Sequence, residues 1–295
     1  MALLRLTRHR RTRPDRRGES DDRVPASNGV EVSQHHADTI SKEHGAGAGA
    51  GGSQVPFFEI SDLSVAYGGI QALRQLSLHV AEGEIVALLG PNGAGKTTTL
   101  KAIVGWTPAN RGRIMFEGRN ITRLKTEDIV RLGVTMVPQG RQVFSRLTVA
   151  ENLMLGGLAR AGRSSNGDMA SDMLDMFTVL RERNRELAGN LSGGEQQQLV
   201  IARALMSNPR LVIFDEPSLG LAPALATRTF ELVARLRSRG LTIIIVEQNV
   251  GLALAISDRA YVLAGGQLAV SGDVASVRKS PQLKEIFLGI ESAAL

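Results

Sequence analysis

A short glycine-rich segment holds the first residues whose types and spacing point to chemistry. Between an apolar run and a helix-compatible stretch, it reads Gly90, Pro91, Asn92, Gly93, Ala94, Gly95, Lys96, Thr97 and Thr98. Glycines let the backbone turn its N–H groups toward phosphate oxygens, and a helix start adds the positive end of a dipole. Lys96 would contact the β- and γ-phosphates, and the Thr97 hydroxyl would bind Mg²⁺. The segment therefore predicts a phosphate-binding loop, and its context argues against an incidental glycine-rich turn.

Two adjacent carboxylates end the apolar run Leu211–Asp215, which has the composition of a buried parallel strand. Successive strand residues point to opposite faces, so Asp215 and Glu216 are expected to have different roles. Asp215 suits the coordination shell of a Mg²⁺ ion. Glu216 suits the position where an attacking water is oriented or deprotonated. The pair indicates that the bound nucleotide is hydrolysed.

Residues 191–197, with the sequence Leu-Ser-Gly-Gly-Glu-Gln-Gln, narrow this chemistry to a family. Alone, they read as a polar helix start, because Ser192 and Glu195 have the spacing of a capping box. Together with the phosphate-binding loop, Gln139 and the acid pair, they resemble the ATP-binding subunit of ABC transporters. The resemblance covers about residues 57–289 and implies ATP and Mg²⁺ as cofactors.

The resemblance also implies a nucleotide site shared by two subunits. In ABC ATPases, two nucleotide-binding domains pack head to tail, and each ATP lies between the phosphate-binding loop of one chain and the signature of the other. Ser192, Gly193 and Gly194 would then contact the γ-phosphate from the facing subunit, through N–H groups at a helix start. Hydrolysis would require this dimer, with ATP holding it closed and hydrolysis releasing it.

Two further residues gain a role from the same resemblance. Tyr67 matches the aromatic residue that stacks on adenine, although a strand-end aromatic on a sheet surface is an alternative reading. Gln139 matches the glutamine that reaches Mg²⁺ and the attacking water. The alternative interpretation is a loop glutamine that is simply solvated. In the family the segment that begins there faces the membrane subunit, so Gln139 is expected to couple nucleotide state to the permease.

Departures from the common pattern point to a subfamily. Most relatives have a His that contacts the γ-phosphate after the strand Thr242–Glu247, where this chain has Gln248. A Gln amide donates a hydrogen bond but relays no proton, so Gln248 is expected to position groups while Glu216 acts as the base. Leu221 stands where many relatives carry an Asp. With residues 137–152, these features resemble an ATPase of branched-chain amino-acid importers, and related amide and urea importers share them.

The resulting functional prediction is an ATP-hydrolysing importer subunit, peripheral on the cytoplasmic face of the inner membrane. Its expected partners are two transmembrane permeases, a second ATPase in a homo- or heterodimer and, indirectly, an external solute-binding protein, with no nucleic acid. Two alternatives stay open: the ATPase of an exporter or lipid-extraction machine, and a soluble ABC protein acting on ribosomes or DNA. Soluble ABC proteins that act on ribosomes or DNA typically have two nucleotide-binding units or long coiled-coil insertions, and neither is evident in this sequence.

Length, composition and charge restrict the classes of function that this chain can have. The chain has 295 residues with 43% hydrophobic content, enough for a substantial core, and it has no cysteine for a disulfide, thiolate zinc site or nucleophile. No apolar run approaches the roughly 18–20 residues of a membrane span. Residues 1–17 hold seven Arg and one Asp, so they account for the formal charge of +6 and the remaining chain is balanced. A balanced domain argues against binding to nucleic-acid phosphates.

Residues 1–56 are predicted to be a disordered tail, because they are rich in Arg, Ser, His and Gly and lack periodic apolar positions. The simplest reading is a solvated extension, for which a gene start placed too far upstream is one explanation. Contact with anionic lipid is a second reading, at about 1 kcal/mol for each well-placed Arg. A targeting peptide is disfavoured because the tail lacks a hydrophobic region and carries several acids. Residues 290–295 are expected to form a short C-terminal tail.

The elements that must position these residues alternate between strand and helix. Apolar, β-branched runs predict parallel strands buried on both faces, at residues 84–89, 134–137, 211–215 and 242–247. Helical patterns are found at residues 96–104, 195–206, 224–239 and 250–258, and alternation predicts antiparallel strands at 57–65 and 76–80. The fold class is therefore α/β, a P-loop NTPase core with a doubly wound, mostly parallel sheet and an antiparallel β edge.

Residues 148–188 interrupt this alternation, because they read as almost wholly helical, at 148–155 and 169–180. We expect a helical subdomain, at about residues 140–190, inserted in a nucleotide-binding domain that spans 57–289. Three methionines in this block recur at helical spacing, which favours core packing over contact with a permease; they are Met169, Met173 and Met176.

Overall fold

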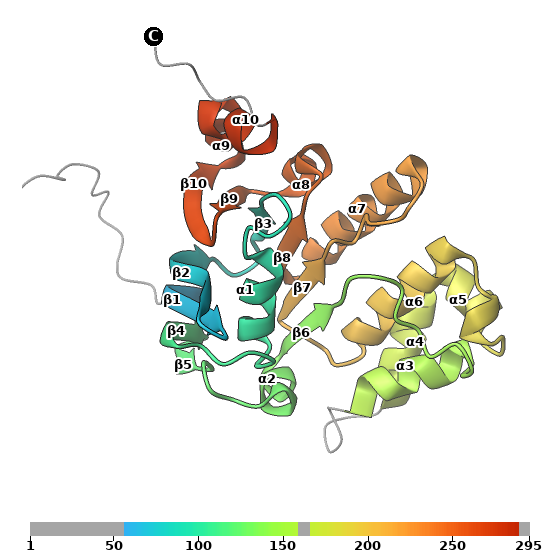
Figure 1. Cartoon of the computed structure of the whole chain (residues 1–295). Helices are drawn as coiled ribbons and strands as arrows, with labels where there is room; N and C mark the ends of the chain where they lie inside the picture. Colours follow the sequence, from blue (N-terminus) through green and yellow to red (C-terminus); the bar gives the residue numbers. More distant parts are fainter. Residues whose placement is uncertain (1–55, 159–165, 289–295) are drawn as a thin grey trace, which may run out of the picture. The chain divides into compact units, whose positions relative to one another are not determined.

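The computed structural model describes residues 56–158 and 166–288 (Figure 1). The predicted tails, 1–56 and 290–295, fall outside these residues except for Pro56. The described part contains two β-sheets, with strand orders β2-β1-β4-β5 and β10-β9-β3-β8-β7-β6.

The four-stranded sheet is antiparallel throughout. It consists of β1 (Phe58–Tyr67), β2 (Ile70–Val80), β4 (Arg111–Phe116) and β5 (Arg119–Asn120). The strands predicted at 57–65 and 76–80 are confirmed, and both are longer because β1 and β2 continue to a tight hairpin at Gly68 and Gly69. The antiparallel strands thus form a sheet of their own, in addition to the antiparallel edge of the second sheet.

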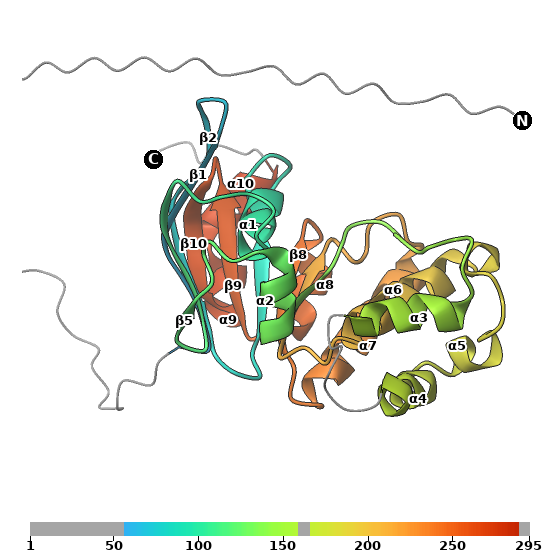
Figure 2. The same cartoon turned by 90° about the horizontal axis from the view of Figure 1, so that it is seen from below.

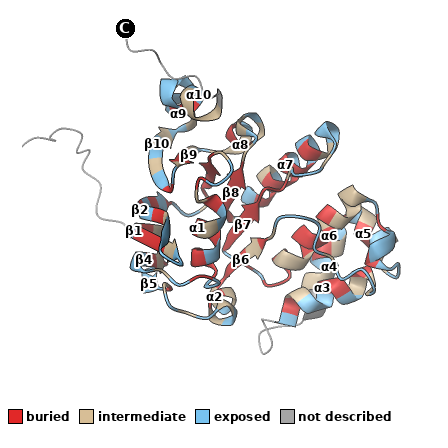
Figure 3. Ribbon diagram, viewed as in Figure 1, coloured by how far each residue is buried: buried red, intermediate tan, exposed pale blue. Residues whose placement is uncertain are grey.

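The six-stranded sheet carries the parallel strands. They are β3 (Ile85–Leu89), β6 (Val134–Val137), β7 (Leu211–Asp215), β8 (Thr242–Glu247) and β9 (Arg259–Ala264), with β10 (Gln267–Asp273) antiparallel at the edge. Every residue of β3, β7 and β8 is buried, as Figure 3 shows for the centre of the sheet. This confirms the strands predicted to be covered on both faces, whereas β9 and β10 were not predicted.

Alternation along β3 divides the interior between two hydrophobic cores. Ile85, Ala87 and Leu89 belong to the core shared with α6 (Gly193–Leu205), α7 (Pro223–Arg237) and α8 (Val250–Ile256). Val86 and Leu88 belong to the core shared with α1 (Lys96–Ile103) and the antiparallel sheet. Burying both faces of a strand in this way requires a continuous apolar sequence, which is the pattern found here.

Three helices outside the helical block were predicted, and both ends of each lie within two residues of the predicted ends. These are α1, α7 and α8, and α7 begins with a proline at its first position, where the missing N–H has no intrahelical partner to lose. Three short helices were not predicted: α2 (Thr126–Leu132), α9 (Val274–Lys279) and α10 (Pro281–Leu288). No helix in residues 56–158 and 166–288 is long and apolar enough to cross a membrane.

The connection from β6 to β7 contains a block of helices. It comprises α3 (Val149–Gly157), α4 (Asn166–Met176), α5 (Thr178–Glu182), the 3₁₀ turn η2 (Ala188–Asn190) and α6. Figures 1 and 2 both show α3 to α6 gathered beside the sheets. The single helix predicted at 169–180 is wrong, because the buried Phe177 leaves helical geometry, with φ −114° and ψ 74°. Met173 is buried in the core, and Met169 and Met176 pack against it, as expected.

Candidate functional site

The predicted chemical groups meet at the carboxyl edge of the parallel sheet. Strands β3, β8, β7 and β6 are neighbours in that order, so the loops that follow them lie along one edge (Figure 1). The phosphate-binding loop follows β3, Gln139 follows β6, Asp215 ends β7 with Glu216 next, and Gln248 follows β8. Open α/β sheets bind ligands at this edge.

The phosphate-binding loop owes its shape to two glycines in close contact with the fold. A Cβ on Gly90 would lie 2.5 Å from the carbonyl oxygen of Leu263. Gly95, the N-cap of α1, has φ +104°, and a Cβ there would lie 2.6 Å from the Leu73 side chain. Larger residues therefore do not fit at these two positions, and the loop makes a tight turn directly before α1. The first N–H groups of α1 then face the loop, where an anion binds favourably.

Lys96 is buried inside this loop, with 4% of its surface exposed. Its Nζ donates to the carbonyl oxygens of Gly90, at 2.8 Å, and Pro91, at 3.1 Å. The same Nζ lies 3.7 Å from Oε1 of Glu216. The ammonium group therefore links the phosphate-binding loop to the carboxylate that follows β7.

Glu216 receives hydrogen bonds from both predicted glutamines. Nε2 of Gln139 donates to Oε2 at 3.0 Å, and Nε2 of Gln248 donates to Oε1 at 2.7 Å. The backbone of Glu216 has a left-handed φ of +47°, a conformation that is costly for a residue with a Cβ. Its N–H donates to the carbonyl oxygen of Val246 at 2.9 Å. The structure thus brings together the three residues predicted to be catalytic, Glu216, Gln139 and Gln248.

Asp215 is buried, and its Oδ1 has no hydrogen-bond partner among the described residues. Burial raises the pKa of Asp215 to about 6, and the charge of Glu216 adds to the rise, while Lys96 and Lys101 oppose it. A buried carboxylate oxygen with no donor fits a divalent cation. Within the described residues no three His, Asp or Glu side chains could hold a metal by themselves, so such a cation needs further ligands from phosphate or water.

The raised pKa predicts that the Asp215→Asn protein is more stable than the wild type when no nucleotide or Mg²⁺ is present. An acid whose folded pKa lies above its unfolded value of 3.8 stabilises the fold below that value, and the effect is lost as pH rises through about 6. At pH 8 the ionised group therefore destabilises the wild type, by about 1–3 kcal/mol. Thermal unfolding should show a higher Tm for Asp215→Asn at pH 8 and a smaller difference at pH 5.

Asp273 provides the control for this measurement. It caps α9, and hydrogen bonds from the side chain and backbone of Ser276 lower its pKa. The Asp273→Asn protein should therefore show no gain in Tm at pH 8. A Tm for Asp215→Asn equal to or below that of the wild type at pH 8 would contradict the electrostatic description of Asp215.

The signature residues lie elsewhere in the same chain. Ser192 is the N-cap of α6, and it forms the predicted capping box with Glu195, whose Oε2 accepts from Ser192 N at 2.7 Å. Gly193 and Gly194 begin the helix. Both views place α6 away from α1, so one chain does not bring these residues to its own phosphate-binding loop.

Tyr67 ends β1, where 44% of its surface is exposed. Its hydroxyl shares a hydrogen bond with Oγ1 of Thr107, at 3.1 Å, just after α1. The tyrosine is thus held at one end while much of the residue remains accessible. This geometry is compatible with stacking on a base and equally with a strand-end aromatic.

Glu247 is a residue of the site that sequence reasoning did not select. It is the last residue of β8, 2% exposed, and its carboxylate accepts hydrogen bonds from three backbone N–H groups. The signal was present in the sequence, because an acid that ends a buried apolar strand is the feature that identified Asp215.

Comparison with known proteins agrees with this arrangement. The family described as ABC transporter matches residues 73–219. BraG of Pseudomonas aeruginosa, the ATP-binding protein of high-affinity branched-chain amino acid transport, is 45% identical over 227 residues, which cover 77% of this chain and 97% of BraG. The chain belongs to the ABC transporter family. As a member of the ATP-binding class of this family, it is an ATP-hydrolysing enzyme.

Two other relatives show how widely this ABC ATPase fold is used. The lipopolysaccharide export ATP-binding protein LptB of Escherichia coli K12 is 36% identical over 230 residues, covering 77% of this chain and 95% of LptB. The crystal structure of the ADP conformation of the ATP-binding cassette MJ1267 has a TM-score of 0.71 and 30% identity, covering 80% of this chain and all of MJ1267.

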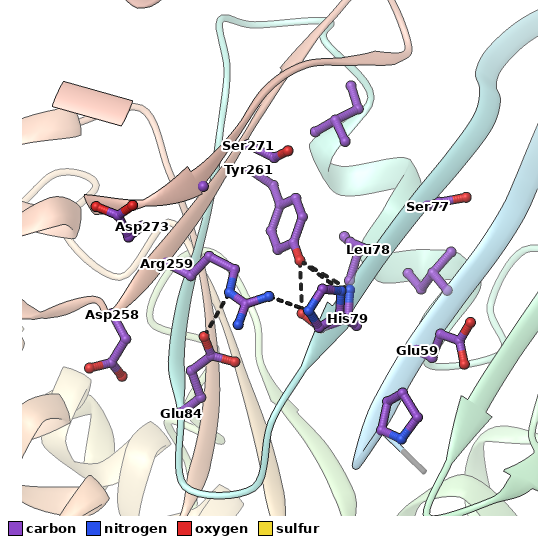
Figure 4. Close-up of a pocket in the computed structure, with 14 residues that line it drawn as sticks. Glu59, Ser77, Leu78, His79, Glu84, Asp258, Arg259, Tyr261, Ser271 and Asp273 are labelled. Atoms are coloured by element: carbon purple, nitrogen blue, oxygen red, sulfur yellow. Dashed lines mark hydrogen bonds and ion pairs between the residues drawn. The ribbon is translucent and has the colours of Figure 1, made fainter. Parts of the chain in front are cut away.

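A cavity of about 680 Å³ in this ABC ATPase lies apart from the nucleotide residues, between β2 and strands β9 and β10 (Figure 4). Tyr261 donates its hydroxyl to the carbonyl of His79 at 3.0 Å and accepts from His79 N at 3.2 Å. Nε of Arg259 pairs with Oε1 of Glu84 at 2.9 Å, and Arg259 also contacts the His79 ring. These bonds join the two sheets, so the cluster has a structural role.

Proposed function

We propose that this chain energises uptake of branched-chain amino acids or related small amides. The observation that carries the proposal is the 45% identity to BraG along 97% of that protein. Gln248, in place of the common histidine, supports the same subfamily. The 36% identity to LptB favours a second candidate, the ATPase of an exporter.

ATP binding is proposed to use the phosphate-binding loop and Lys96. Phosphate oxygens would replace the carbonyl groups of Gly90 and Pro91 as acceptors for Nζ, since an anion is a stronger acceptor than a neutral carbonyl. Thr97, Gln139 and Asp215 would hold Mg²⁺ together with phosphate oxygens, and the ion neutralises charge on the transferred group. Tyr67 would stack on the adenine ring.

Hydrolysis is proposed to use Glu216 as the base. When Lys96 turns toward phosphate, the carboxylate loses its closest cation and becomes available to accept a proton from water. Gln139 and Gln248 hold its two oxygens from opposite neighbouring strands, which fixes the direction of the carboxylate. Neither amide can take the proton itself, so both act by positioning.

The signature residues are proposed to come from a second subunit. Ser192, Gly193 and Gly194 lie at the start of α6. Both views place α6 away from α1, the helix that follows the phosphate-binding loop. A head-to-tail dimer would place them at the nucleotide of the facing chain, where the N-terminus of a 13-residue helix favours the γ-phosphate.

A groove next to Gln139 is proposed to dock a cytoplasmic segment of the permease. It has a volume of about 440 Å³ and is lined by Phe144, Leu155, Leu158 and Arg203, among others. Phe144 is 52% exposed and Leu158 is 61% exposed, so the groove presents apolar side chains to a partner. Arg203 donates to the carbonyl of Gln142 at 2.6 Å, which connects the groove wall to the Gln139 loop. This contact gives the permease a route to the catalytic residues.

Uptake of labelled leucine, isoleucine or valine in cells that lack this chain tests the proposal. Wild-type chain should restore uptake, and Phe144→Glu should restore less than about one tenth of it, because the exposed apolar ring is replaced by a charged group that loses its hydration on docking. The variant protein, purified alone, should keep its basal ATPase activity. Permease subunits should co-purify with the wild type and be lost from the variant.

Ile70→Glu is the matched control, because Ile70 is also apolar, 76% exposed and outside the groove. It should retain the permease. Normal retention in Phe144→Glu would contradict the docking groove. Unchanged amino-acid uptake in cells without the chain, together with a defect in lipopolysaccharide export, would favour the exporter candidate instead.

A further inference from the structure

Glu247 is an acid in an almost fully buried position at the end of β8. Its Oε1 accepts from the backbone N–H of Ser218 at 3.0 Å. Its Oε2 accepts from the N–H of Gln248 at 3.0 Å and of Asn249 at 3.2 Å. Within the described ranges no Lys or Arg forms an ion pair with it, so backbone donors provide its compensation for burial.

These three donors belong to two different loops of the site. Ser218 lies two residues after Glu216, and Asn249 is the N-cap of α8, directly after Gln248. The carbonyl of Val246, one residue earlier on β8, accepts from Glu216 N at 2.9 Å. The end of β8 therefore fixes the loop that carries the proposed base and the loop that carries its glutamine partner.

We propose that Glu247 is a positioning residue for ATP hydrolysis. By fixing two consecutive N–H groups after β8, it sets the backbone from which Gln248 reaches Oε1 of Glu216, at 2.7 Å. Glu247 also accepts from the N–H of Ser218, so the position of its carboxylate, and with it that of Gln248, depends on the start of the loop at 218–223. The inference rests on the proposed roles of Glu216 and Gln248.

Only a carboxylate meets the geometry of this position. It offers two oxygens and no donor, which matches three converging N–H groups. An amide of the same shape offers one oxygen and an NH₂ group, so in the Glu247→Gln protein a donor must face at least one backbone donor. The loop on that side has to shift, and Gln248 or Glu216 shifts with it.

The test is steady-state ATP hydrolysis by the purified full-length Glu247→Gln protein, well below its Tm. We expect kcat to fall by about 10-fold or more, since displacement of a catalytic group by about 1 Å can cost 100-fold. KM for ATP should stay within about threefold, because the hydrogen bonds of the Glu247 carboxylate go to Ser218, Gln248 and Asn249 and not to the phosphate-binding loop. Hydrogen exchange of the Ser218, Gln248 and Asn249 amides should become faster.

Glu84 provides a matched control, because it is a buried acid that precedes β3, at the opposite end of the same sheet. Its Oε2 accepts from Ala81 N at 2.8 Å, and its Oε1 pairs with Arg259. Glu84→Gln should lower the Tm while leaving kcat, KM and the exchange of the three amides unchanged. The Glu216→Gln protein, measured beside them, reports on the base itself.

The outcomes distinguish a failure of the role of Glu247 from a failure of the proposed base, Glu216. A normal kcat in Glu247→Gln beside an inactive Glu216→Gln overturns the role of Glu247 alone. An equal loss of kcat in Glu84→Gln and Glu247→Gln also overturns it, because general destabilisation then explains the effect. Normal hydrolysis in Glu216→Gln overturns the proposed base and, with it, the reason for positioning Gln248.

Discussion

The Glu216→Gln protein should bind ATP with nearly wild-type affinity and hydrolyse it about 10²–10⁴-fold more slowly, the usual contribution of a general base. Gln keeps the shape of the side chain but cannot accept a proton from water. Nucleotide affinity depends mainly on the phosphate-binding loop, which the substitution leaves in place. Single-turnover hydrolysis and equilibrium binding of ATP, measured on the same preparation, separate the two effects.

A second consequence follows if ATP joins two subunits. Bound ATP that is not hydrolysed should accumulate a closed dimer, visible by size-exclusion chromatography or light scattering with ATP and Mg²⁺. Glu127→Gln is the control, since Glu127 is an acid in the first turn of α2, outside the site. It should hydrolyse ATP normally and show no such dimer. Wild-type turnover in Glu216→Gln would remove Glu216 from the mechanism.

The arrangement around Glu216 was partly predictable from the order of elements. Parallel strands place their carboxyl ends at one edge, so groups after β3, β6, β7 and β8 had to lie near that edge. Sequence could not give the distances, because the contacts of Glu216 with Gln139, Gln248 and Lys96 depend on which strands are neighbours. The observed order β3-β8-β7-β6 puts β7 between the two strands that supply the glutamines.

Two of the missed features, β9 and the break between α4 and α5, have a common physical cause. Strand β9 pairs with β3 and is mostly buried, yet its sequence, Arg-Ala-Tyr-Val-Leu-Ala, is short and has a single β-branched residue. Its strand conformation comes from pairing with β3, a tertiary effect that local propensity does not contain. The break between α4 and α5 is similar, because Phe177 leaves the helix to reach the core. Local periodicity alone cannot show where a side chain will be buried.

The Lys96→Ala protein should lose most of its affinity for ATP, by about 10²–10³-fold. Nζ already makes two charge-assisted hydrogen bonds inside the phosphate-binding loop, at 2.8 and 3.1 Å, and ATP would accept these from the same position. Two such bonds to phosphate are worth about 3–4 kcal/mol together, which gives that loss of affinity. Fluorescent-nucleotide titration or calorimetry at fixed salt measures it directly.

Two further variants distinguish the charge of Lys96 from its volume and from general electrostatics. Lys96→Met fills the loop without an ammonium group, so it should lose as much affinity as Lys96→Ala. Lys101→Ala removes an exposed cation from the same helix, and it should bind ATP within about threefold of wild type, because screened surface charges contribute little. Lys96 also neutralises Glu216 at 3.7 Å and opposes the raised pKa of Asp215, so its removal should lower the Tm of the nucleotide-free protein. Wild-type affinity in Lys96→Met would show that the loop does not hold phosphate through this residue.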